Sequence, residues 1–164
     1  MPPLAQVKAD LAGGGKSRGL VEQCLARISD QSGEGGRVFL KVHAADALAA
    51  ADFYDRRRGA APSPFAGIPV SIKDLFDIAG DVTTAGSIIL RDAAPAKRDA
   101  PSVARLRAAG FIPIGRSNMT EFAFSGIGIN PHYDTPANTY DRKARRVPGG
   151  SSSGAAIYVL AGVS

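Results

Sequence analysis

Residues 67–74 read Gly-Ile-Pro-Val-Ser-Ile-Lys-Asp, and this stretch decides how the chain is expected to fold. Apolar side chains at positions 68, 70 and 72 alternate with Pro69, Ser71 and Lys73. This is the two-residue period of a β-strand with one apolar face. Lys73 then points the same way as Ser71, so the pattern predicts a strand that ends in a lysine beside the protein core.

A helix and a second strand are predicted farther along the chain. Pro101 begins a helical pattern that runs to Ala109, and Gly110 is expected to end this helix in a left-handed conformation. Residues 111–115 then resume as a strand. Because strands joined by a helical crossover usually pair in parallel, we predict an α/β fold with a mixed or parallel sheet covered by helices.

The first 60 residues are predicted to be a helical segment. Helical spacing favours helices over residues 4–12, 17–29 and 43–58, with Ser17 as the N-cap of the second. An extended Ala-Pro-Ser-Pro connector over residues 61–64 follows. Residues 61–164 are then the first part of an α/β core, incomplete at its C-terminal end. Within that core, residues 116–148 should be mostly irregular, and residues 151–163 should begin a helix.

Composition places the chain among ordinary globular domains. It has 164 residues, of which 45% are hydrophobic and 21% charged, and its net charge is +5. No apolar run is long enough to span a membrane, and the N-terminus lacks the pattern of a secretory signal, so a cytoplasmic location is predicted. The basic clusters 56–58 and 142–146 have no interleaved aromatic residues and are interpreted as solvated loops rather than a nucleic-acid surface. The single cysteine, Cys24, is expected to be a small buried core residue.

Three motifs resemble sites of other protein classes. Residues 13–17 resemble a phosphate-binding loop, but Asp10 stands where that motif needs a glycine. Residues 126–131 begin like a dinucleotide fingerprint, yet a proline replaces its third glycine. Residues 150–154 fit the Gly-x-Ser-x-Gly pattern of an esterase with Ser152 as nucleophile. The preceding segment is basic and interrupted by proline instead of forming a buried strand, which disfavours this alternative without removing it.

A lysine and a serine offer a more consistent chemistry. A lysine amine has an unperturbed pKa near ~10.4, so it acts as a base at neutral pH only when burial lowers that value. The predicted strand supplies such burial at Lys73. Farther on, Gly149 and Gly150 precede three serines and then an apolar helix, whose free amide groups could hold a polarised carbonyl. The alternative interpretations are an exposed lysine at a strand end and a flexible Gly/Ser linker.

Taken together, residues 67–74, 100–122 and 146–156 resemble the amidase signature family, whose members cleave amide bonds with a Ser-Ser-Lys triad. The resemblance implies that Lys73 is the general base and that Ser151, after a cis peptide bond, relays a proton. It also implies that the nucleophilic serine follows about two dozen residues after Ser151, beyond Ser164. The chain is therefore expected to be an N-terminal fragment that is inactive alone.

The family pattern also implies a substrate contact in the stretch 121–127, where Ser125, Gly126 and Ile127 are expected to line the acyl pocket. It implies no metal ion and no cofactor. The expected partner is a small-molecule amide, without a membrane or direct nucleic-acid contact, and a homodimer is compatible with the sequence.

Three functions are left open by the resemblance. The first is a free-standing amidase that hydrolyses a carboxylic amide to an acid and ammonia or an amine. The second is the glutaminase subunit of a tRNA-dependent amidotransferase, which would act with partner subunits. In those subunits the lysine motif commonly reads Lys-Asp-Asn, whereas Leu75 follows Asp74 here, and this favours the first function. The third, from a different class, is a non-catalytic remnant or interaction module.

Overall fold

A small mixed sheet forms the centre of the molecule. The computed structural model describes residues 3–141 and 143–160. Strands β1 (Phe39–Val42), β2 (Pro69–Lys73) and β3 (Ile112–Ser117) lie in the order β1-β3-β2. β2 pairs with β3 in parallel, and β1 pairs with β3 antiparallel. The predicted α/β class and the parallel pairing of the two predicted strands are thus confirmed.

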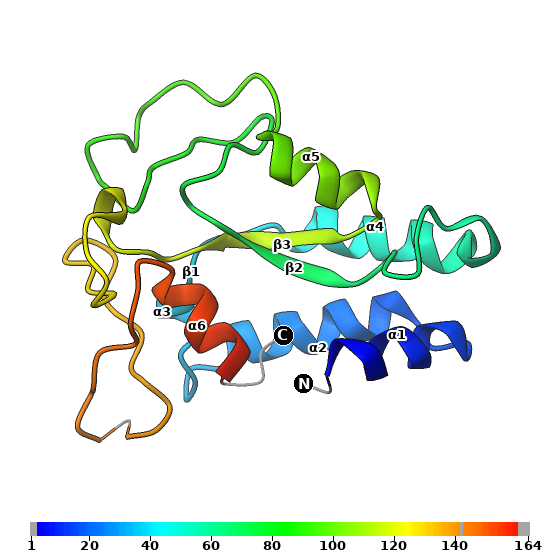
Figure 1. The fold of residues 1–164 in the computed structure, drawn as a ribbon, viewed down its shortest axis with the longest axis horizontal. Coiled ribbons are helices and arrows are strands. Elements are labelled where there is room, and N and C mark those ends of the chain that lie inside the picture. The colour runs from blue at the N-terminus through cyan, green and yellow to red at the C-terminus, as the bar shows by residue number, and fades with distance from the viewer. Residues whose placement is uncertain (1–2, 142, 161–164) are drawn as a thin grey trace.

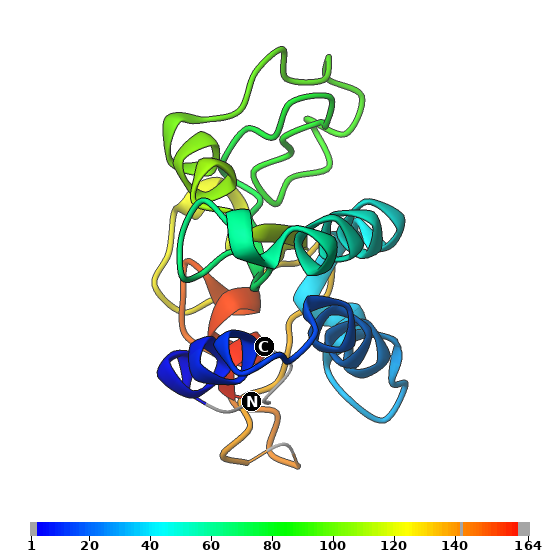
Figure 2. The ribbon, with the colours of Figure 1, turned by 90° about the vertical axis from the view of Figure 1, so that its right-hand side faces the viewer.

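Helices cover the sheet on both sides (Figure 1). Helix α5 (Pro101–Ala108) lies on one side, and α1 (Leu4–Ala12), α2 (Ser17–Ser29) and α6 (Ser153–Leu160) lie on the other. Helix α4 (Ala44–Arg56) runs beside α2 (Figure 2). Two short 3₁₀ turns, η1 and η2, complete the described elements. The helical elements are α1 (Leu4–Ala12), α2 (Ser17–Ser29), α3 (Gly35–Val38), α4 (Ala44–Arg56), η1 (Arg58–Ala60), α5 (Pro101–Ala108), η2 (Glu121–Ala123) and α6 (Ser153–Leu160).

The largest core cluster fills the space between β3 and helices α2, α4 and α6. Its members come from both halves of the chain and include Cys24, which is fully buried as expected. A second cluster packs β2 against α5 through Ile72 and Val103. Apolar burial of this kind contributes roughly 25 cal/mol per Å², so these contacts fix β2 and β3 between the helical layers.

Helix α5 ends in the glycine cap that the sequence predicts. Gly110 has a φ of 89°, a conformation that residues with a side chain rarely adopt. Its amide donates to the carbonyl of Arg107 and the amide of Phe111 donates to Leu106, which is the paired pattern of a Schellman cap. This cap turns the chain directly from α5 into β3.

The predicted N-cap of α2 was wrong. Ser17 is the first helical residue, and its hydroxyl accepts a hydrogen bond from Arg58. The carboxylate of Asp55 instead accepts hydrogen bonds from the amides of Ser17 and Arg18, at 2.8 and 3.1 Å. A residue 38 positions away therefore caps this helix.

The first 60 residues also hold a strand that the sequence did not predict. β1 follows the single turn of α3 directly and adds an antiparallel edge to the sheet, with an irregular register between Phe39 and Lys41. The division of the chain at residue 60 stays a prediction. Helix α6 begins at Ser153, two residues later than expected, and residues 161–163 of the predicted helix lie outside the described residues.

Over the described ranges, no helix is long and apolar enough to cross a membrane. The described residues of the second basic cluster, 143–146, lie exposed in a loop, as expected for a solvated segment. The described residues of the stretch 118–150 are irregular apart from η2, which agrees with the prediction for this region.

Candidate active site

The fold brings Lys73 and Ser151 together although they are 78 residues apart in the sequence. Lys73 is the last residue of β2, and Ser151 lies just before α6. Lys73 Nζ lies 2.6 Å from Ser151 Oγ. This distance allows a direct proton transfer between the amine and the hydroxyl.

The alternation of β2 places the lysine. Ile72 is buried against α5, and Lys73 is half-buried because neighbouring side chains of a strand point to opposite faces. Burial lowers the pKa of the Lys73 ammonium below its usual value, since the charged form loses hydration. The environment therefore shifts the equilibrium toward the neutral amine that a general base requires.

Ser151 is held by backbone contacts on both sides. The peptide bond between Gly150 and Ser151 is cis, as the resemblance implied. The carbonyl of Ser151 accepts a hydrogen bond from the amide of Thr120 at 2.9 Å, and the amide of Gly150 donates to the carbonyl of Gly126 at 2.7 Å. The serine segment is thus joined to the loop that follows β3.

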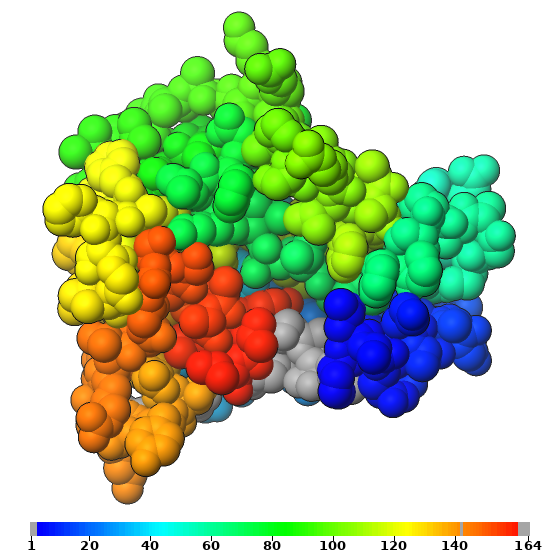
Figure 3. Space-filling view, in the orientation of Figure 1, coloured from blue at the N-terminus to red at the C-terminus, as the bar shows by residue number. Residues whose placement is uncertain are grey.

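The two joined segments approach so closely that only glycine fits at residue 128. Gly128 has a φ of 86°, and a Cβ built there would lie 2.2 Å from the carbonyl oxygen of Gly149. The surface in Figure 3 shows the same adjacency, where the yellow loop near residue 120 meets the orange-red segment before α6. The backbone of residues 126–128 therefore forms one wall beside Ser151.

The three predicted substrate contacts lie in this loop, but they differ in whether they hydrogen-bond to the segment around Ser151. Gly126 is tied to it through the hydrogen bond to Gly150. Ser125 is half-buried, and its hydroxyl accepts a hydrogen bond from the amide of Ile127 at 3.3 Å. Ile127 is 51% exposed. Within the part of the chain that the structure describes, neither Ser125 nor Ile127 hydrogen-bonds to Lys73 or Ser151, so their role as substrate contacts stays a prediction.

Sequence reasoning missed three buried hydroxyls around this site. Ser117 is the cross-strand register partner of Lys73, Thr120 lies beside Gly150, and Ser153 begins α6. Among the described residues, their hydroxyl groups have no hydrogen-bond partner. They supply polar groups that a substrate or an ordered water could use. The triple serine could have suggested Ser153, whereas all six residues of β3 are buried, so no alternation marks Ser117, and Thr120 lies outside both stretches.

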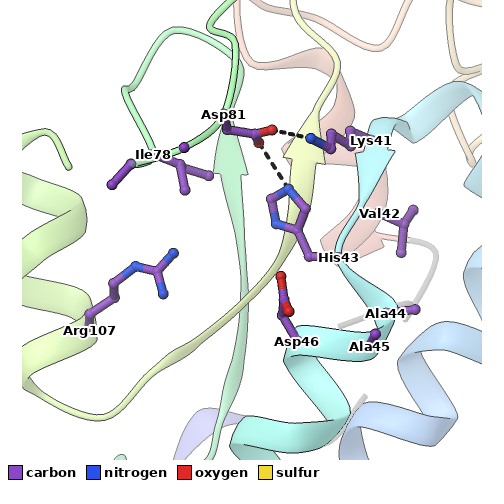
Figure 4. Close-up of a pocket in the computed structure, with 11 residues that line it drawn as sticks. Lys41, Val42, His43, Ala44, Ala45, Asp46, Ile78, Asp81 and Arg107 are labelled. Carbon is purple, nitrogen blue, oxygen red and sulfur yellow. Dashed lines mark hydrogen bonds and ion pairs between the residues drawn. The ribbon is translucent and has the colours of Figure 1, made fainter. Parts of the chain in front are cut away.

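A separate cavity of about 340 Å³ lies at the start of α4 (Figure 4). Its lining includes Lys41, His43 and Asp81, but neither Lys73 nor Ser151. The carboxylate of Asp81 accepts a hydrogen bond from Lys41 and lies 3.0 Å from His43 Nε2. Burial alone would raise the pKa of Asp81, but the Lys41 hydrogen bond and the charges of His43 and Lys41 lower it below its usual value. Asp81 thus joins the loop after β2 to β1 and α4.

The structure also bears on the motifs of other protein classes. The glycines at residues 13–15 form a turn between α1 and α2, so a helix and not a strand directly precedes them. Both histidines pair with carboxylates, His43 with Asp81 and His132 with Glu121. Neither hydrogen-bonds to Ser152 within the described ranges. No group of three or more His, Cys, Asp or Glu side chains in the same ranges is arranged to hold a metal ion.

Comparison with known proteins gives the family. The sequence model of the amidase family, described as "Amidase", matches residues 19–164. This chain belongs to the amidase signature family. The A subunit of glutamyl-tRNA(Gln) amidotransferase from Chloroflexus aggregans is 46% identical over 145 residues, which are 87% of this chain and 29% of that protein. The AtzE subunit of 1-carboxybiuret hydrolase from Pseudomonas sp. (strain ADP) is 45% identical over 118 residues, 71% of this chain and 25% of that protein.

Solved structures of the family share this fold. Native peptide amidase from Stenotrophomonas maltophilia has a TM-score of 0.83 at 34% identity, covering 99% of this chain and 34% of that chain. A chain from a vestigial protein complex linked to the evolutionary origins of an s-triazine catabolic enzyme has a TM-score of 0.88 at 38% identity, covering 99% of this chain and 35% of that chain. The present chain therefore spans about a third or less of the length of these relatives, and corresponds to part of the amidase signature fold.

Proposed function

We propose that this chain is the N-terminal part of an amidase that hydrolyses a carboxylic amide through a Ser-cisSer-Lys triad, with Lys73 as base and Ser151 as proton relay. The observation that carries the proposal is the 2.6 Å contact between Lys73 Nζ and Ser151 Oγ. The half-buried position of Lys73, which lowers its pKa, supports the role of base. The nucleophilic serine of the proposed triad lies in the longer protein, beyond residue 164.

In the proposed reaction the nucleophilic serine attacks the carbonyl carbon of the amide. Its proton passes to Ser151 Oγ, and Ser151 gives its own proton to Lys73 Nζ. When the tetrahedral intermediate collapses, the C–N bond breaks and the leaving amine takes this proton back along the same path. Water then attacks the carbonyl carbon of the acyl ester and passes a proton through Ser151 to Lys73. The ester C–O bond breaks, the nucleophilic serine takes this proton back along the same path, and the carboxylic acid is released.

A second candidate is the glutaminase subunit of a tRNA-dependent amidotransferase. Its support is the 46% identity to the A subunit of glutamyl-tRNA(Gln) amidotransferase. The sequence Lys73-Asp74-Leu75, where Lys-Asp-Asn is common in those subunits, favours a free-standing amidase instead. The third candidate, a non-catalytic remnant or interaction module, requires that the natural protein lack the nucleophilic serine. The gene sequence beyond the codon for Ser164 distinguishes it from the other two.

Ammonia release by the full-length gene product tests the enzymatic candidates. Lys73→Ala should lower kcat by at least about a thousandfold while the protein still folds, and Ser151→Ala should lower it strongly but less completely. Lys16→Ala, which changes an exposed lysine, is the matched control and should leave turnover unchanged. Undiminished turnover in Lys73→Ala would remove this residue as the base.

Substrate and partner dependence separate the two enzymatic candidates. A free-standing amidase releases ammonia from simple amides without partners, whereas a glutaminase subunit needs its partner subunits to hydrolyse glutamine. A cytoplasmic location and a homodimer stay predictions, which cell fractionation and light scattering would test.

A further inference from the structure

The residue after the proposed base is a buried carboxylate with several partners. Asp74 is 1% exposed. Its Oδ1 accepts a hydrogen bond from Arg116 Nε, and its Oδ2 accepts hydrogen bonds from Thr84 Oγ1 and from the amide of Gly86, the latter at 2.9 Å. Burial removes the hydration of a carboxylate, and an ion pair returns roughly as much free energy as this loss costs. Stabilisation of the fold alone therefore does not account for the buried pair.

The guanidinium of Arg116 also contacts three residues of the loop that follows β2. Arg116 is 2% exposed. Its Nη2 donates hydrogen bonds to the carbonyl of Phe76 and to Thr83 Oγ1, both at 3.1 Å. Its Nη1 lies 3.6 Å from Asp81 Oδ2, the same carboxylate that binds Lys41 and His43 in Figure 4. The planar guanidinium of Arg116 thus binds several residues of the chain around the end of β2.

The backbone of Asp74 is held as firmly as its side chain. Its amide donates to the carbonyl of Ser117 at 3.1 Å, and its carbonyl accepts from the amide of Ala85 at 2.9 Å. Ala85 in turn accepts a hydrogen bond from the amide of Phe122, two residues after Thr120, whose amide binds Ser151. These hydrogen bonds connect Asp74, the residue after Lys73, to the segment whose Thr120 amide binds Ser151. Lys73 itself contacts Ser151 directly.

We propose that Asp74, held by Arg116 and Thr84, is a positioning residue that fixes the end of β2 so that the amine of Lys73 stays within hydrogen-bond distance of Ser151. The inference rests on the proposed function, because it assigns Asp74 a role only through Lys73. Misplacement of a reacting group by about 1 Å can lower the rate about a hundredfold. Loosening these contacts should therefore reduce kcat more than it reduces substrate binding.

The test uses the full-length protein with Asp74→Asn and Thr84→Val. Both variants keep the side-chain shape but weaken or remove a hydrogen bond that the carboxylate of Asp74 accepts. Each should lower kcat by about 10- to 100-fold, with KM changed much less and the midpoint of the pH profile unchanged, because Lys73 remains the base. Thr84→Ser keeps the hydroxyl and should restore kcat.

Asp55→Asn is the matched control. Asp55 also binds a guanidinium, that of Arg58, and two backbone amides, but it caps the start of α2, which lies beside Gly67 before β2 and not at the end of β2 that holds Lys73. It should lower the melting temperature without lowering kcat. If Thr84→Val folds and keeps the kcat of wild type, the positioning role is wrong even when Lys73→Ala is inactive. If Lys73→Ala retains full turnover, the proposed function itself fails, so the two failures are distinguishable.

Discussion

Replacement of Gly128 by alanine should damage the site through a backbone clash. A Cβ at this residue would lie 2.2 Å from the carbonyl oxygen and 2.8 Å from the carbonyl carbon of Gly149. Because nonbonded carbon atoms pack at about 3.5–4.0 Å, the two segments must separate by roughly 1 Å or more. The positive φ of residue 128 adds backbone strain for any residue with a side chain. We expect this strain and the overpacking together to lower the free energy of unfolding by about 2–5 kcal/mol.

The same separation should also reduce catalysis, since the hydrogen bond from the amide of Gly150 to the carbonyl of Gly126 joins these two stretches beside Ser151. A displacement of this size should lower kcat/KM of the full-length protein about a hundredfold. Thermal unfolding and ammonia release are the two assays. Gly19→Ala is the control, because a Cβ there meets open space within α2, and it should raise stability by about 0.5–1 kcal/mol with kcat/KM unchanged. A Gly128→Ala protein with the stability and kcat/KM of wild type would refute the reasoning.

Three further predictions follow from the burial of single groups. Because burial lowers the pKa of Lys73, kcat/KM of the full-length protein should rise with pH to a midpoint below ~10.4, and a midpoint at or above that value would contradict the assignment. The lowered pKa of Asp81 means that its contribution to stability is present above about pH 4 and is lost as pH falls through its folded-state value. Asp81→Asn should therefore destabilise the protein in urea more at pH 7 than at pH 3, and an equal loss at both pH values would count against the ion pairs. Ile114→Ala, at a fully buried core position, should cost about 2–5 kcal/mol in the same urea titration, whereas a loss below about 1 kcal/mol would show a core that repacks around the change.

Much of the fold followed from local patterns. The bounds of α1 and α2 agree with the helical spacing, and α4, α5, β2 and β3 were each found from their periods and breakers. β1 was missed because it is short, follows a glycine-rich turn and owes its place to pairing with β3. The cap of α2 was missed because Asp55 reaches it from α4, and such long-range contacts leave no trace in the local sequence.

Less of the candidate site than of the fold could be predicted from the sequence. Alternation placed Lys73 at a strand end, but only the family resemblance paired it with Ser151, because no periodicity links residues 78 positions apart. The contacts of Asp74 and Arg116 were not predicted at all. Charged residues are usually exposed, so a sequence gives no sign that these two are buried against each other.

Because Cys24 is buried, the reactivity of its thiol measures how often the core of the chain opens. This is the only thiol in the sequence, and it lies fully enclosed among side chains of α2, α4, β3 and α6. Burial also raises the pKa of the thiol, so the reactive thiolate is scarce while the core is closed. A thiol reagent can therefore label Cys24 only when these elements part, and the rate of labelling measures how often they do so under native conditions.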